Sequence, residues 1–63
     1  MWEINANGTF AENKELGTAL RCVYCMDGLV RVKLKYKTLG TFTKMTDAKN
    51  FLESKVKEFN GNV

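Results

Sequence analysis

Residues 18–37, TALRCVYCMDGLVRVKLKYK, contain two strand-like runs on either side of a turn signal, the strongest structural pattern in the chain. Residues 18–25 and residues 29–37 are rich in Val, Leu and Tyr, and the triplet MDG occupies positions 26–28. Two such runs joined by a short segment that contains Gly are typical of a β-hairpin. We therefore expect two antiparallel strands at the centre of the protein.

Two registers compete for this hairpin, and they differ by one residue. A two-residue Asp-Gly turn would pair Met26 with Leu29 and would place Arg21 on the apolar face. A three-residue turn with Gly28 in the left-handed conformation would instead pair Cys25 with Leu29. Because a one-residue slip moves every side chain to the other face and burying an unpaired Arg is costly, the second register is predicted. Its apolar face contains Leu20, Cys22, Tyr24, Val30, Val32, Leu34 and Tyr36.

A smaller hairpin is predicted near the N-terminus. Residues 2–5 alternate apolar and polar, as in a short strand, and Asn7-Gly8 is a turn signal. Residues 9–12 are expected to return as a second strand. Residues 12–17 are mostly polar and are expected to form a loop.

A helix is predicted after residues 41–45, which form either a short strand or the tail of the preceding one. Thr46 suits the N-cap, Asp47 suits the first turn, and Asn60-Gly61 is a stop signal. Apolar residues recur between them at helical spacing and form a single stripe. The stripe consists of Ala48, Phe51, Leu52, Val56 and Phe59.

Together these elements predict an α+β fold in one domain, residues 1–63. The expected architecture is an antiparallel sheet of three to four strands with one C-terminal helix packed on one face. Trp2, Phe10 and Leu16 are expected to close one end of the core. If they were exposed together, they would instead be anchors for a protein partner.

The composition limits the class of function. The chain is 44% hydrophobic, which is too apolar for a disordered protein, yet a domain this short buries only about 60% of its unfolded surface. No run of about 18 apolar residues and no secretory signal pattern is found. With only two Cys, a cytoplasmic protein without a membrane segment is expected.

The residues usually needed for catalysis are missing from the sequence. There is no His, and no glycine-rich phosphate loop or pair of carboxylates is found. Cys22 and Cys25 have C-x-x-C spacing, but within a strand their Cα atoms would lie about 10 Å apart, too far for a disulfide. One such pair is also only half of a zinc site. We therefore expect no enzymatic activity, no metal and no cofactor.

Positive charge is concentrated in the middle of the chain. Residues 17–45 contain six Lys or Arg and one Asp, a net charge of +5, while residues 1–16 carry −2 and residues 46–63 carry 0. Strict alternation in residues 31–37, RVKLKYK, would place four cations on one face of a strand. Arg21 would face Lys33 across the hairpin. The candidate binding residues are therefore Arg21, Arg31, Lys33, Lys35 and Lys37.

This basic face supports two functional hypotheses and one simpler explanation. Phosphates of a nucleic acid would relieve its repulsion and release counterions. Alternatively, the protein is an inhibitor or adaptor of the phage type that binds a host protein, through an acidic surface or through a strand edge. The simpler explanation is that lysines on an open sheet face provide solubility and block edge-to-edge aggregation.

A recognisable pattern occurs in the second half of the chain. It consists of Leu-Gly-Thr-Phe at 39–42, Thr-Asp-Ala at 46–48 and Phe51. With it, residues 20–59 resemble the DNA-binding domains built from a three-stranded sheet and a helix. These include the plant APETALA/ethylene-response-factor domain and the arm-binding domain of tyrosine recombinases. Such domains lay their sheet in the major groove with the helix behind it. The resemblance implies a DNA-facing surface of Arg21, Val23, Arg31, Lys33 and Lys35.

Overall fold

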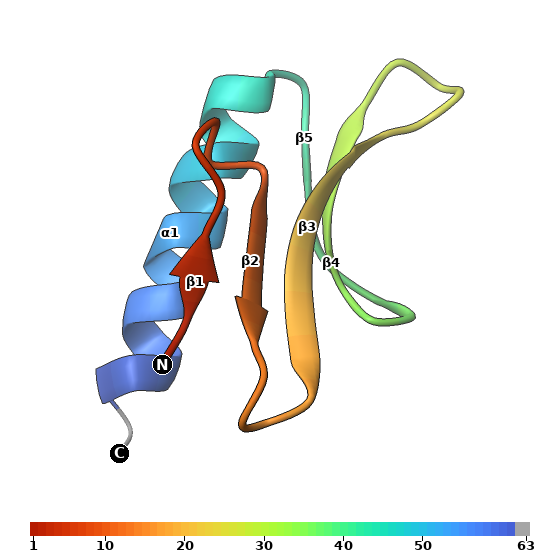
Figure 1. The fold of residues 1–63 in the computed structure, drawn as a ribbon. Helices are drawn as coiled ribbons and strands as arrows, with labels where there is room; N and C mark the ends of the chain where they lie inside the picture. Colours follow the sequence, from red (N-terminus) through yellow and green to blue (C-terminus); the bar gives the residue numbers. More distant parts are fainter. Residues whose placement is uncertain (62–63) are drawn as a thin grey trace.

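The computed structural model describes residues 1–61, which form one antiparallel sheet and one helix (Figure 1). The sheet has five strands rather than the predicted three to four, and their spatial order follows the chain. The elements are β1 Glu3–Ile4, β2 Phe10–Asn13, β3 Thr18–Tyr24, β4 Val30–Leu34, β5 Lys37–Phe42 and α1 Met45–Gly61. The α+β class is confirmed. No helix in the described part of the chain is long and apolar enough to cross a membrane.

The central hairpin adopts the predicted register. Arg21 pairs with Lys33, and the Cys25 N–H donates to the Leu29 carbonyl at 2.9 Å. Gly28 has a φ of 82°, a left-handed conformation that most residues avoid. The turn therefore contains three residues, and the even-numbered side chains of β3 and β4 face the helix.

The core lies between that face and α1. Among the residues that face the core, Leu20, Val30, Val32 and Leu52 are completely buried. The predicted helical stripe is confirmed, since all five of its residues are buried or pack against the core. Tyr24 and Tyr36 were predicted to face the core, but both are exposed. Figure 1 gives the reason, because the turns at both ends of β4 project away from α1.

The second turn corrects the prediction of one continuous strand over residues 29–37. The strand ends at Leu34, the chain reverses at Lys35 and Tyr36, and Lys37 then pairs back with Leu34. Two-residue hairpin turns favour Gly, Asn or Asp because they need positive φ. Neither residue of this turn is one of those, and Lys35 adopts a φ of 55°. Because neither position 35 nor position 36 has a residue typical of turns, the sequence pattern predicts one continuous strand and misses the fifth strand.

β5 contains an irregularity that accommodates two aromatic rings. The pairing with β4 shifts between Val32 and Lys33, and Gly40 lies opposite Val32. A Cβ atom at Gly40 would lie 3.0 Å from the Phe42 ring and 3.3 Å from the Phe51 ring. Those two rings pack together with centroids 5.2 Å apart. Gly40 is therefore required for a close approach of side chains within a strand.

The predicted N-terminal hairpin is present as β1 and β2. The Asn5 side chain accepts hydrogen bonds from the N–H groups of Thr9 and Phe10, at 2.9 and 3.1 Å, which closes the turn. Residues 12 and 13 continue β2, so the predicted loop begins only at residue 14. The buried Asn13 accepts a hydrogen bond from the Leu16 N–H at 3.0 Å.

Trp2, Phe10 and Leu16 do not close one end of the core together. Trp2 is 8% exposed and stacks on Phe59, with ring centroids 5.7 Å apart. Phe10 pairs with Arg21, which places it on the opposite face of the sheet. Leu16 is exposed in the turn before β3. The prediction therefore holds for Trp2 alone.

The helix begins two residues earlier than an N-cap at Thr46 predicts. Met45 is its first residue, and the Lys44 carbonyl accepts a hydrogen bond from the Ala48 N–H at 3.3 Å. Thr46 therefore lies in the first turn and is not the N-cap. The helix continues to Gly61, and the residues after that predicted stop lie outside the described range.

We expect Gly40→Ala to lower the free energy of unfolding by about 1–3 kcal/mol, because the added methyl group displaces the Phe42 ring. Urea unfolding of the variant measures the loss. Thr41→Ala is the matched control, since Thr41 is exposed, and a change within about 0.5 kcal/mol is expected there. Equal stability of the two variants would contradict the crowding at Gly40.

Lys35→Gly is expected to stabilise the protein by about 1 kcal/mol. A left-handed conformation costs an L-residue about 1–2 kcal/mol and costs Gly no steric energy. The melting temperature should rise by about 4–8 °C. Lys37→Gly, two residues later in β5, should instead destabilise by about 0.5–1 kcal/mol. Destabilisation by both variants would show that the Lys35 turn is not strained.

Candidate functional site

Three cations share the open face of the central strands. Arg21 lies directly opposite Lys33, and both point away from the helix. Lys35 follows in the turn, next to this pair, and shares an open hollow with Arg21. No ion pair involves these three residues within residues 1–61. Like charges opposite each other destabilise a sheet, so an anion bound here would relieve the repulsion.

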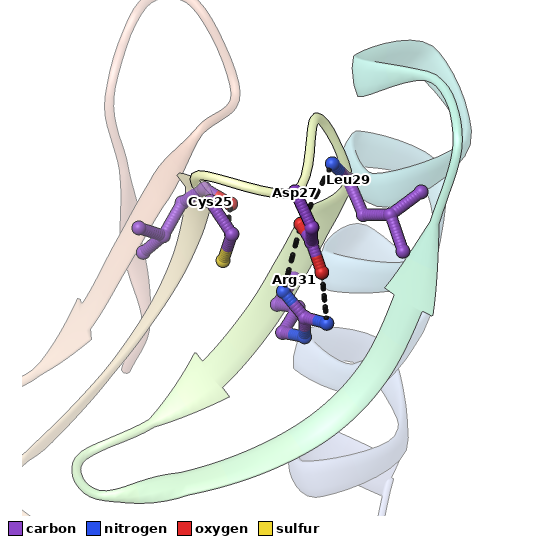
Figure 2. Close-up of polar contacts among 5 residues, drawn as sticks. Cys25, Asp27, Leu29 and Arg31 are labelled. Atoms are coloured by element: carbon purple, nitrogen blue, oxygen red, sulfur yellow. Dashed lines mark hydrogen bonds and ion pairs between the residues drawn. The ribbon is translucent and has the colours of Figure 1, made fainter.

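Arg31 is on the same face, but its charge is already neutralised. Its guanidinium donates two hydrogen bonds to the Asp27 carboxylate, at 2.7 and 3.3 Å (Figure 2). Asp27 also accepts a hydrogen bond from the Leu29 N–H at 3.0 Å. These contacts lower the pKa of Asp27, chiefly through Arg31, and raise the pKa of Arg31. Arg31 therefore stabilises the turn, and it is a weaker candidate for binding an anion than Arg21, Lys33 and Lys35.

Lys37 does not join the predicted row of cations. It pairs with Leu34, and so points to the other side of the sheet from Lys33. The predicted alternation fails after Leu34 because the chain reverses there. Val23 pairs with Arg31 and does lie on the open face, as the DNA-binding resemblance implied.

Two open hollows flank the unpaired cations. One of about 450 Å³ is lined by Arg21, Lys35 and Tyr36. The other, of about 380 Å³, is lined by Arg21, Lys35 and Lys14 and also by the carboxylate of Glu12, with neutral residues of β2, β3 and the turn between them. Tyr36 and Lys14 are candidates that the sequence pattern missed. The alternation of apolar and polar residues predicts that Tyr36 faces the core. Lys14 belongs to residues 1–16, whose net charge of −2 gave no indication of a basic site.

Carboxylates limit the basic face on its N-terminal side. Glu3 pairs with Glu12, and Glu12 pairs with Ala19 on the open face. On the cationic side, Arg21 lies over the Phe10 ring, with its guanidinium carbon 5.7 Å from the ring centroid. Such a contact holds a guanidinium in place without neutralising it. On this face of the sheet, the cations without an ion pair therefore form a narrow band along β3, β4 and the Lys35 turn.

The two cysteines have different surroundings. Cys22 pairs with Val32 and packs against the core, whereas Cys25 lies in the turn beyond β3. Both thiols are free, and burial raises the pKa of Cys22. Within the described residues, no group of three or more Cys, Asp or Glu could hold a metal ion.

Comparison with protein-family models, curated proteins and solved structures found no match to this chain.

The pH dependence of stability should reveal the contacts of Asp27. A carboxyl with a lowered folded-state pKa stabilises the fold above its unfolded pKa of about 3.9, and this stabilisation is lost as the pH falls through the folded value. Asp27→Asn removes the charge at every pH. We expect its deficit in unfolding free energy to be constant between about pH 5 and 7 and to shrink below about pH 4. Urea unfolding across this range is the measurement, and a constant deficit down to about pH 2 would contradict the assignment.

Proposed function

We propose that the protein binds nucleic acid through Arg21, Lys33 and Lys35. The observation that carries this proposal is the grouping of three cations on one open face, where no carboxylate in the described chain pairs with them. Cations that are held together despite their repulsion favour a polyanionic ligand. Each phosphate contact also releases counterions, which supplies affinity without sequence preference.

The composition of the face indicates contacts to phosphate more than to bases. Two of the three residues are Lys, which binds phosphate as a point charge, whereas guanine is read mainly by the planar fork of Arg. Arg21 is the one residue of the three that could make a forked contact. Binding with little sequence specificity is therefore the expected behaviour.

A protein partner is the second candidate, and the tip of the β3–β4 hairpin favours it. Tyr24 is 69% exposed and Met26 is fully exposed, on either side of Cys25. Asp27 braces this tip through Arg31 and Leu29 (Figure 2). Large apolar side chains on a rigid tip are typical anchors of protein interfaces. Capture of a partner from nuclease-treated lysate that is lost with Met26→Ala would favour this candidate.

Salt dependence tests the nucleic-acid proposal. If three cations contact phosphates, the logarithm of the binding constant should fall with the logarithm of salt concentration with a slope of about −2 to −3. Lys33→Ala should make this slope shallower by about 1 and weaken binding about five- to eightfold at 0.1 M salt. Fluorescence anisotropy with labelled DNA of random sequence measures both quantities.

Lys57→Ala is the matched control for charge. Lys57 is exposed on α1, where it pairs with Glu53 at 3.7 Å, and it does not lie on the open face of the sheet. Its removal changes the net charge as much as Lys33→Ala does, but should leave the slope unchanged. Binding that is insensitive to salt, or equally weakened by both variants, would rule out the proposed face.

A further inference from the structure

We propose that the ligand of the basic face is single-stranded nucleic acid and that Tyr36 stacks on one of its bases. Arg21 and Lys35 would contact the phosphates on either side of that base. The inference rests on the proposed function and deepens it, because it names the form of the nucleic acid and adds an aromatic contact to the cationic ones.

The position of Tyr36 is the first argument. Its side chain is fully exposed, although Tyr usually buries much of its ring. Together with Arg21 and Lys35 it lines an open hollow of about 450 Å³. An exposed ring beside two cations is the combination by which proteins bind single strands, since every base has a face that can stack.

The backbone of the turn is the second argument. Lys35 holds a left-handed φ of 55° in a two-residue hairpin turn, where Gly or Asn would be favourable. A turn selected for stability alone would contain one of those residues. Strained residues are often found at functional sites, where they hold a side chain in a required position. Here the strained backbone presents a cation and an aromatic ring next to each other.

Continuity with the second hollow is the third argument. Arg21 and Lys35 line both hollows, so a single strand of nucleic acid could extend from Tyr36 across these two cations. The second hollow, of about 380 Å³, extends from them to Lys14 and Gly17 in the turn before β3. Three cations therefore line the path, and Glu12 is the one carboxylate among the residues that line the two hollows.

The narrowness of the band favours a single strand over a duplex. Glu12 borders it on one side, Arg31 is neutralised by Asp27, and Lys37 points to the other face. One row of cations matches one phosphate backbone. In a duplex the bases are stacked on each other and show only their edges, so the face of Tyr36 would find no partner there.

Three probes separate this inference from the proposed function. They are a labelled oligothymidylate of about 16 nucleotides, a duplex of the same length, and inorganic polyphosphate as a ligand without bases. Tyr36→Ala should weaken binding of the oligothymidylate about fivefold to a hundredfold, the range for losing one stacked base. Its binding of polyphosphate should stay within twofold of the wild type. Tyr36→Phe, which keeps the ring, should bind the oligothymidylate like the wild type.

Tyr24→Ala is the matched control. Tyr24 is exposed at the end of β3, next to the turn at the other end of β4 from Tyr36, and should not contact the nucleic acid. Equal melting temperatures of the variants exclude an effect through folding. If Tyr36→Ala binds the oligothymidylate as tightly as the wild type, or if the duplex binds more tightly than the single strand, the inference is wrong while the proposed function stands. If none of the three probes binds, both are wrong.

Discussion

The three-residue turn at the tip of the β3–β4 hairpin determines which way every side chain of the two central strands points. Gly28 supplies the left-handed conformation, and the Asp27 carboxylate joins the turn to the Leu29 N–H and the Arg31 guanidinium. With one residue fewer in the turn, Arg21 would share a face with Val30, Val32 and Leu34, and Leu20 would move to the face of Lys33. The core and the basic face are therefore two consequences of one register.

The same register forces like charges together. Arg21 and Lys33 lie opposite each other, and Lys35 joins them from a strained turn. Each arrangement costs the isolated protein stability. A domain of this size is only marginally stable. Because the charge repulsion and the strained turn occur at the same place, this part of the surface is the candidate functional site. On this face of the sheet, Glu12 and the Arg31–Asp27 pair border the band of cations, whose narrow shape suits a narrow anionic ligand.

Much of the candidate site could be predicted from the alternation of residues 18–34. That pattern correctly placed Arg21 and Lys33 on the open face and the valines of β4 in the core. The pattern failed at residues 35 and 36, where the turn contains none of the residues that usually signal one. As a result Lys37 was assigned to the wrong face and Tyr36 to the core. Composition alone could not have revealed that this Tyr lies beside the cations.

Local signals were sufficient to predict three parts of the fold: the central hairpin with its register, the N-terminal hairpin and the C-terminal helix. Gly28, the Asn7-Gly8 pair and the apolar stripe of α1 each act through neighbours a few residues away, so their effects are visible in the pattern. Local signals did not reveal the reversal at Lys35, the need for Gly40 beneath two aromatic rings or the sharing of two hollows by Arg21 and Lys35. These features depend on packing between distant segments, because favourable burial of β5 against α1 can outweigh an unfavourable turn.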